Sequence, residues 1–283
     1  LLSICIPAYN RPEWLARAIE SAVAVDREEE LEIVVSDDSN NDASEKATRD
    51  NLKTWGGKWH YQRNQPSLGM AHNWNEAVRQ SMGRYVIVLH DDDFLNPAGI
   101  RDTLDVLRIE PEVRALLGGV NVVGPDKTII KRQQFAAREF WEPKRALREL
   151  LSVSALVRFP GMIVRRDIFD EVELFDQEME VAADLDMWQR IFAVSGIHLL
   201  PYHTANYTVH PDALTMKMFD AEAIRRLEIL FERAAKLNVL EKDDLEACRA
   251  NMMHQFILAG TVRFLKRRDL NNARRVFALF DLT

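Results

Sequence analysis

The first half of the chain alternates short apolar runs with segments in which apolar residues recur at helical spacing. The apolar runs, which predict buried strands, lie at residues 1–7, 31–36, 59–62, 85–89 and 115–123. The helical segments lie between them, at about 12–23, 43–55, 70–82 and 97–109. This order predicts an α/β fold, in which a mostly parallel sheet is flanked by helices.

Polar residues mark the expected starts of the first two helices. Asn10 has a short polar side chain that can accept a hydrogen bond from a first helical turn, and Pro12 suits that turn because it has no N–H to satisfy. We therefore expect Asn10 to cap the first helix. Asp42 can cap the second helix or act as a ligand, and both alternatives stay open.

The second half of the chain has a less regular pattern. A strand-like run at 159–164 and a helix at 184–194 interrupt a largely polar region between about 125 and 200. After residue 215, three amphipathic helices are predicted. We expect a sheet domain over residues 1–215, with the acceptor side at about 125–215, and an α-helical C-terminal appendage over 216–283.

The composition is that of an ordinary globular protein, with 47% hydrophobic and 29% charged residues. The formal net charge of −7 argues against a nucleic-acid-binding surface, which would need a basic face. Neither a run of about 18 apolar residues nor a signal peptide is visible, so a cytoplasmic location is expected. Cys5 and Cys248 lie too far apart to suggest a zinc site, and Cys5 is expected in the core.

Three consecutive carboxylates, Asp91 to Asp93, follow His90 at the end of the apolar run 85–89. Their mutual repulsion would be relieved by an opposite charge, and a divalent cation with oxygen ligands could supply it. The same residues could instead form a solvated turn. The run alone does not decide between the two.

Two other polar clusters follow apolar runs: Pro7 to Asn10 after the first, and Asp37 with Asp38 after the second. Because ligands of open α/β sheets bind at the carboxyl ends of the strands, all three clusters would share one edge. Turn formation remains the structural alternative for the aspartates. The chain has neither a G-x-G-x-x-G loop nor a P-loop pattern, so a metal would have to neutralise any bound phosphate.

The chain resembles the family 2 glycosyltransferases, whose Rossmann-like nucleotide-sugar-binding fold is usually called GT-A. The resemblance covers roughly residues 2–215 and rests on five segments in the expected order: Ser3 to Asn10, Val34 to Asp42, Asn64 to Ala77, Gly83 to Asp93 and Asp184 to Arg190. His90 stands where the D-x-D metal pattern of the family most often begins with aspartate. Asp91 with Asp93 and His90 with Asp92 therefore both keep the D-x-D spacing.

The resemblance implies roles for individual residues. It assigns the nucleotide site to Pro7, Ala8, Tyr9, Asn10, Asp38, Asn73, Asp91 and Asp92. It assigns Mn²⁺ or Mg²⁺ to Asp93 with support from Asp91, while His210 can add a metal or phosphate ligand or be an ordinary loop histidine. Asp184 is implied to be the general base, with Asp186 as the alternative base and helix capping as the structural alternative.

The implied activity is an inverting, metal-dependent transfer of a sugar from a nucleotide-diphosphate donor, most often a UDP- or dTDP-sugar, to a glycan or lipid-linked acceptor. A sugar nucleotidyltransferase and a catalytically silent nucleotide- or carbohydrate-binding module are the alternatives. Lys266, Arg267 and Arg268, beside apolar residues of the C-terminal helices, permit a peripheral membrane contact. The sequence makes no prediction of an oligomeric state.

Overall fold

The computed structural model describes residues 1–153, 155–210 and 219–282 of the chain. These residues form two compact units. The first comprises residues 1–140, 158–177 and 197–210, and the second comprises the described parts of 141–157, 178–196 and 219–282. The domain boundary expected at 215–216 lies outside the described residues, and the helices that follow it share a unit with the two earlier segments.

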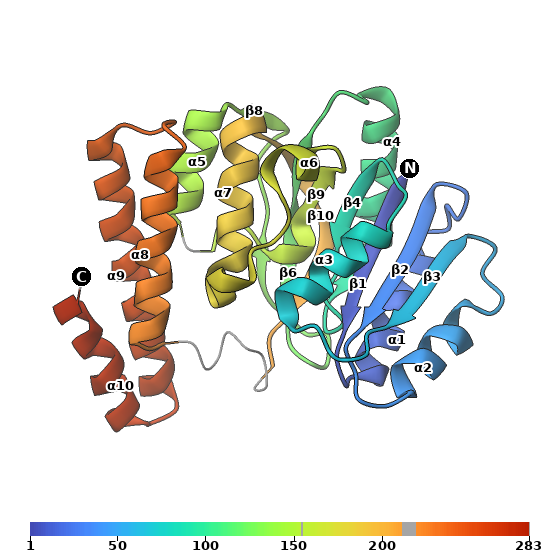
Figure 1. The fold of residues 1–283 in the computed structure, drawn as a ribbon, viewed down its shortest axis with the longest axis horizontal. Coiled ribbons are helices and arrows are strands. Elements are labelled where there is room, and N and C mark those ends of the chain that lie inside the picture. The colour runs from blue at the N-terminus through green and yellow to red at the C-terminus, as the bar shows by residue number, and fades with distance from the viewer. Residues whose placement is uncertain (154, 211–218, 283) are drawn as a thin grey trace. The chain divides into compact units, whose positions relative to one another are not determined.

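The first unit is built on a sheet, whose strands range in colour from blue near the N-terminus to orange near residue 200 (Figure 1). Its strands, together with the short β8, are β1 (Leu2–Ala8), β2 (Leu31–Asp37), β3 (Lys58–Arg63), β4 (Tyr85–Val88), β5 (Phe94–Leu95), β6 (Ala115–Val123), β7 (Ile129–Gln133), β8 (Glu139–Trp141), β9 (Met162–Arg165) and β10 (Ile197–Thr208). Within the described residues the strand order is β3-β2-β1-β4-β9-β6-β10-β5, with β7 paired to β6 and β8 to β10.

Strand direction places the carboxyl ends of several strands at one edge of this sheet. Strands β1, β2, β3 and β4 are mutually parallel, and β10 is parallel to β6. Strand β9 is antiparallel to both β4 and β6, so β4 and β6 run the same way on either side of it. The residues that follow β1, β2, β4, β6 and β10 therefore all emerge at the same edge.

Helices cover both faces of the parallel strands. The helices of this unit are α1 (Pro12–Val23), α2 (Ala43–Leu52), α3 (Met70–Gln80), α4 (Pro97–Ile109) and α6 (Ile168–Val172). Side chains alternate along β1, so that Leu2, Ile4 and Ile6 join one apolar cluster with residues of α1 and α4. Cys5 points to the other face, where its thiol lies 3.3 Å from the Ala77 carbonyl oxygen of α3. Figure 1 shows α3 crossing that face.

The second unit is almost wholly helical. It contains α5 (Pro143–Ser152), α7 (Ala183–Ser195), α8 (Ala221–Lys236), α9 (Lys242–Lys266) and α10 (Leu270–Phe277). Short 3₁₀ segments lie at Gln177–Ala182 and Ala278–Leu282, and another precedes β9 at Phe159–Gly161. The predicted helices of the C-terminal region are present, but their bounds differ from those that the periodicity suggested.

The α/β prediction is confirmed, with three differences. The structure adds antiparallel strands β5, β7 and β9 to the parallel ones. Residues 143–152, which fall in the region interpreted as irregular, form the amphipathic helix α5 with Ala146, Leu147 and Leu150 buried. The twelve-residue strand β10 was not predicted at all.

Candidate active site

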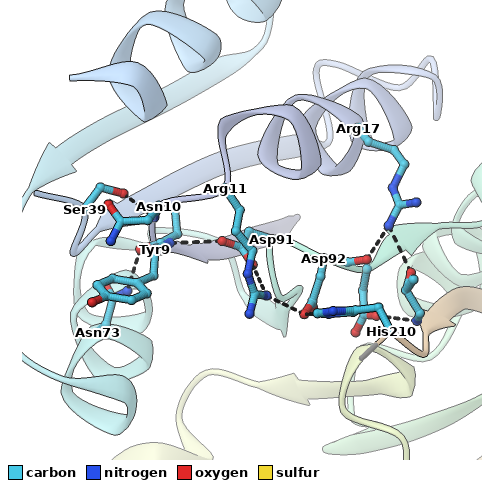
Figure 2. A network of polar contacts seen from close by, with 12 residues as sticks. Tyr9, Asn10, Arg11, Arg17, Ser39, Asn73, Asp91, Asp92 and His210 are labelled. Carbon is cyan, nitrogen blue, oxygen red and sulfur yellow. Dashed lines mark hydrogen bonds and ion pairs between the residues drawn. The ribbon is translucent and has the colours of Figure 1, made fainter. Parts of the chain in front are cut away.

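The three polar clusters meet at the predicted edge of the sheet. The N–H of Tyr9, just beyond β1, donates to Asp91 Oδ2 at 3.0 Å, and the N–H of Asp38 donates to the Ala8 carbonyl at 3.0 Å. The Asp91 carboxylate thus holds the end of β1 against the loop that follows β4. The sequence prediction that the clusters lie together is consistent with this geometry, and Figure 2 shows Tyr9 and Asn10 in one network with Asp91 and Asp92.

Arg11 connects two of the three acids. Its Nη1 lies 2.6 Å from Asp92 Oδ2 and 3.4 Å from Asp91 Oδ1. The guanidinium projects from the start of α1 toward both carboxylates (Figure 2). Since these side chains are only slightly exposed, the positive charge of Arg11 offsets repulsion between acids that water screens poorly.

The end of β10 supplies the other contacts of the acidic run. His210 Nε2 lies 2.9 Å from Asp92 Oδ2, and the N–H of Thr208 donates to Asp93 Oδ1 at 2.8 Å. Arg17 of α1 donates to the Asp92 carbonyl oxygen and, at 3.0 Å, to Thr208 Oγ1. Residues more than a hundred positions apart are therefore held together at one point.

Burial sets the ionisation of the acids. It raises the pKa of Asp91 to about 7, with the charge of Asp92 adding to the effect. Burial and the charge of Asp92 also raise the pKa of Asp93 well above its usual range. Burial opposes ionisation of Asp92 as well, but His90, His210 and Arg11 outweigh it and lower the pKa of that carboxyl. The site thus holds an ionised acid between two acids that resist ionisation.

The acidic run has the donor set of a divalent-cation site. One potential ligand atom from each of His90, Asp92 and Asp93 lies within 4.8 Å of the others. Asp93 is 1% exposed, and its Oδ2 has no hydrogen-bond partner among the described residues. A buried carboxylate oxygen without a partner is costly, and a cation would satisfy it. The residues present therefore fit a Mn²⁺ or Mg²⁺ ion.

Asp91 and His210, which were predicted as metal ligands, make other contacts. Asp91 has Tyr9 N on one oxygen and Arg11 on the other. His210 has its Nε2 on Asp92, and its ring lies 4.9 Å from that of Trp14. Among the described residues, the possible metal cluster consists of His90, Asp92 and Asp93, and both Asp91 and His210 lie next to it without being part of it.

Asp38, predicted to bind the nucleotide base, anchors the loop before α3. Its carboxylate accepts hydrogen bonds from Asn64 Nδ2 at 2.8 Å, Ser67 Oγ at 3.0 Å and Gly69 N at 2.8 Å, with Leu68 N as a further donor. Gly69 adopts a φ of +85°, which favours glycine. The side chain is 4% exposed and lies directly under the edge where the nucleotide was expected.

Asn10 is not the helix cap that the sequence analysis predicted. Arg11 occupies the N-cap position of α1, and Asn10 lies outside the helix with a φ of +53°. Asparagine tolerates this left-handed conformation better than most residues. Its N–H donates to Ser39 Oγ at 2.7 Å, and its Oδ1 accepts from Asn40 N at 3.2 Å. Asn10 therefore joins the loops after β1 and β2.

The remaining residues predicted for the nucleotide site differ in exposure. Pro7 and Ala8 are buried at the end of β1, whereas Tyr9 is 57% exposed and presents its ring at the edge. Asn73 of α3 donates from Nδ2 to the Ala8 carbonyl at 3.2 Å and accepts from Asn64 at 3.1 Å. Asn73 thus holds the end of β1 through the Ala8 carbonyl. Among these four residues of the predicted nucleotide site, Tyr9 is the one exposed to solvent.

The two candidate bases belong to the second unit and differ in their contacts. Asp186 is fully buried, and its carboxylate accepts from Arg190 at 2.9 and 3.0 Å and from Arg233 at 3.3 Å. Asp184 lies in the first turn of α7, is partly exposed, and accepts from the Leu185 N–H at 2.7 Å. Asp186 is thus a structural ion-pair partner, while Asp184 is only partly buried.

Sequence reasoning missed the arginines of this site. Arg11 and Arg17 lie six residues apart on α1 and approach the acidic run from one side (Figure 2). The available signal was the charge imbalance itself, because three adjacent carboxylates at the end of a buried strand require nearby positive charge. Arg11 also directly follows the predicted nucleotide loop.

Comparison with known proteins identifies the family. The model of the glycosyl transferase family 2 matches residues 3–173, which is more than half of the chain. Among curated relatives, a chondroitin synthase from Escherichia coli is 23% identical over 239 residues, covering 84% of this chain and 33% of that protein. The chain spans about a third of the length of the curated relatives that it matches first.

Solved structures of glycosyltransferases share the fold. Staphylococcus aureus TarS 1–349 in complex with UDP-GlcNAc matches with a TM-score of 0.66 and 14% identity, covering 99% of this chain and 91% of that one. The mannosyltransferase PcManGT from Pyrobaculum calidifontis, in complex with GDP-Man and Mn²⁺, matches with a TM-score of 0.64 and 16% identity, covering 100% and 75%. These structures show that the chain shares a GT-A-like fold, and the match to the family model over more than half of the chain establishes that it belongs to the glycosyl transferase family 2.

Proposed function

We propose that the chain is an inverting, metal-dependent glycosyltransferase that binds its nucleotide-sugar donor at the carboxyl edge of the sheet. The observation that carries this proposal is the cluster of His90, Asp92 and Asp93, with a buried carboxylate oxygen left unpartnered at the ligand-binding edge of an α/β sheet. The exposed ring of Tyr9 borders the same edge and offers a surface for a nucleotide base.

The diphosphate of the donor is proposed to lie against Asp92 and Asp93 through the cation. A divalent cation bound there would offset the negative charge that develops on the departing diphosphate. Arg11 and Arg17, which already face the acidic run, add positive charge on the side of α1. Mn²⁺ accompanies GDP-Man in PcManGT, which supports the same arrangement for this chain.

The acceptor hydroxyl is proposed to attack the anomeric carbon while a carboxylate takes its proton. The new bond joins the acceptor oxygen to the sugar, the bond to the diphosphate oxygen breaks, and the nucleoside diphosphate leaves. We assign the base to Asp184, because Asp184 is partly exposed in the first turn of α7, whereas Asp186 is fully buried beside Arg190 and Arg233. A base in this position contributes about 10²- to 10⁴-fold to the rate.

The donor is proposed to be a UDP- or dTDP-sugar and the acceptor a glycan or a lipid-linked glycan. The UDP-GlcNAc complex of TarS supports a uridine donor, and the name of the chondroitin synthase supports a glycan acceptor. Because PcManGT was solved in complex with GDP-Man, GDP is included in the nucleotide screen described next.

A thermal-shift screen tests the proposal. The chain is heated with UDP, GDP or dTDP, each with Mn²⁺, with Mg²⁺ or with EDTA. One nucleotide diphosphate should raise the melting temperature in a metal-dependent way. The corresponding radiolabelled donor should then show hydrolysis or transfer. Donor binding without turnover would favour a silent binding module, and the absence of any metal-linked stabilisation would remove the proposed function.

A peripheral membrane contact through the C-terminal helices is also proposed. Leu258, Val262 and Leu265 on α9 and Leu270 and Phe277 on α10 are each about half exposed. Leu265, Leu270, Arg274 and Phe277 line one groove of about 440 Å³. Five exposed basic residues accompany it: Lys266, Arg267, Arg268, Arg274 and Arg275. An apolar surface rimmed by positive charge is complementary to an anionic lipid surface. No helix among the described residues is long and apolar enough to cross a membrane.

Vesicle sedimentation tests this contact. The chain should sediment with vesicles that contain phosphatidylglycerol and much less with pure phosphatidylcholine, and salt should weaken binding. Phe277→Ser and the pair Arg267→Glu with Arg268→Glu should each reduce it, whereas Arg49→Glu, on the first unit, should not. Equal sedimentation with neutral vesicles, or a dimer in solution that Phe277→Ser dissociates, would assign the groove to another partner.

A further inference from the structure

We infer that His90 is a nitrogen ligand of the divalent cation, so that the site has a mixed nitrogen and oxygen donor set. This inference rests on the proposed function and specifies which atoms would hold the metal. Its basis is the position of the His90 imidazole, one nitrogen of which lies within 4.8 Å of carboxylate oxygens of Asp92 and Asp93.

The backbone brings the three donors together. The N–H of Asp93 donates to the His90 carbonyl at 3.0 Å and closes a turn over residues 90–93. The Thr208 N–H holds Asp93 Oδ1 at 2.8 Å, which leaves Oδ2 for another partner. Within the described residues, Asp93 Oδ2 and His90 Nε2 are both buried without a hydrogen-bond partner. The two residues that carry these unsatisfied atoms both belong to the cluster, so we infer that one cation satisfies both atoms.

Aromatic residues fix the imidazole. The ring of His90 is stacked on that of Trp74, with centroids 5.1 Å apart, and lies 4.3 Å from that of Phe159. Packing on Trp74 and Phe159 restricts rotation of the ring, so little conformational entropy remains to be lost when Nε2 coordinates an ion. A histidine held only for packing would be expected to satisfy its ring nitrogens elsewhere.

His210 is the competing nitrogen donor, and its contacts differ. Its Nε2 already lies 2.9 Å from Asp92 Oδ2, so it acts on the cluster by holding one of the proposed ligands. It therefore provides a matched control for His90, since both imidazoles lie beside Asp92 and only His90 has an unpartnered nitrogen among the buried atoms described.

A nitrogen ligand changes the choice of metal. Mg²⁺ prefers an all-oxygen octahedral shell, whereas divalent transition-metal ions, Mn²⁺ and Co²⁺ among them, accept an imidazole nitrogen more readily. The site should therefore bind Mn²⁺ and Co²⁺ in strong preference to Mg²⁺. Replacing His90 with aspartate makes the donor set all-oxygen, so His90→Asp should narrow the difference in affinity between Mn²⁺ and Mg²⁺.

Pulsed electron paramagnetic resonance of bound Mn²⁺ tests the assignment. Uniformly ¹⁵N-labelled protein is loaded with Mn²⁺ and unlabelled UDP, GDP or dTDP, using the nucleotide that stabilises the fold. We expect ¹⁵N coupling from the protein together with ³¹P coupling from the diphosphate. His90→Ala should abolish the ¹⁵N coupling, and His210→Ala should retain it. Isothermal titration should show that His90→Ala weakens Mn²⁺ binding about tenfold or more, since loss of even an outer-shell partner costs that much.

The outcomes separate this inference from the proposed function. Phosphorus coupling without ¹⁵N coupling in the wild-type chain overturns the His90 assignment and leaves the metal-linked donor site in place. Nitrogen coupling that persists in His90→Ala and disappears in His210→Ala also overturns it. The absence of both couplings in the wild-type chain overturns the inference and the proposed function together. His90→Asp, which keeps a ligand at this position, provides the same test should His90→Ala fail to fold.

Discussion

The guanidinium of Arg11 lies 2.6 Å from the carboxylate of Asp92, which is also one of the proposed metal ligands. A protein cation and a metal cation would therefore act on the same acid. Arg11→Met removes the positive charge that faces the carboxylates of Asp91 and Asp92. Their repulsion is then less well offset, which should cost about 1–2 kcal/mol of stability. Mn²⁺ should restore more of the melting temperature in this variant than it adds to the wild-type chain.

Calorimetry with and without Mn²⁺ measures this difference. Arg49→Met is the control, because Arg49 pairs with Glu45 on the exposed surface of α2 and should be nearly neutral. Equal Mn²⁺ shifts in the wild-type chain and Arg11→Met would separate Arg11 from the metal site.

The carboxylate of Asp38 organises the loop before α3, so Asp38→Asn should destabilise the first unit. The amide offers one acceptor oxygen in place of two and turns a donor toward the N–H groups of Leu68 and Gly69. We expect a loss of about 2–4 kcal/mol, because several buried hydrogen bonds to a charged group are affected. Urea unfolding measures it. Asp42→Asn, at an exposed N-cap position, should change stability by less than about 0.5 kcal/mol, and similar losses in both variants would refute the assignment.

Substitution of Asp184 should reduce catalysis, whereas substitution of Asp186 should reduce the stability of the fold. Asp184→Asn should keep the melting temperature and metal-linked nucleotide binding while transfer falls by about 10²- to 10⁴-fold. Transfer assays with the donor found by thermal shift measure this. Unchanged transfer would remove Asp184 as the base.

Asp186→Asn should act on stability instead. Removing the charge of a fully buried carboxylate weakens its ion pairs with Arg190 and Arg233, which should cost about 3–5 kcal/mol. Thermal unfolding by circular dichroism measures the loss. A variant with wild-type stability and no transfer would reverse the two roles.

Cys5 should make stability fall at alkaline pH. Burial raises the pKa of its thiol to about 12 in the folded chain, whereas an unfolded cysteine titrates near about 8.5. Between these values the unfolded chain releases a proton that the folded chain keeps, so rising pH favours unfolding. From pH 8 to pH 10 the wild-type chain should lose about 2 kcal/mol more than Cys5→Ala. Urea titrations at both pH values measure this, and parallel losses would disprove it.

The parallel core of the fold could be predicted because its signals are local. The runs that became β1, β2 and β4 are continuous and apolar, and each ends in polar residues. Strand β10 has no such signal. It contains Pro201 within the first of two shifts in its register with β6, and its pairing depends on residues about 80 positions earlier. Proline inside a strand normally argues against one, so only the tertiary context reveals it.

The candidate site was also predictable only in part. The acids could be grouped from the sequence because each cluster follows a predicted strand. Their partners could not, because Arg11 and Thr208 reach them through helix and strand packing. The Asn10 error has a local cause: asparagine suits both a helix cap and a left-handed loop, and the contact with Ser39, distant in sequence, selects the loop.

Strand β9, antiparallel between β4 and β6, has a consequence for how the protein is made. It keeps β6 and β10 running in the direction of β4, which is why residues 208 and 210 can reach residues 92 and 93. During synthesis the acids emerge more than a hundred residues before these partners. In a nascent chain, the acidic residues 91–93 therefore lack their contacts with residues 208 and 210. Contacts between residues so far apart in sequence form slowly. Ribosome-bound chains that end before residue 208 should show these acidic residues as a segment open to proteolysis.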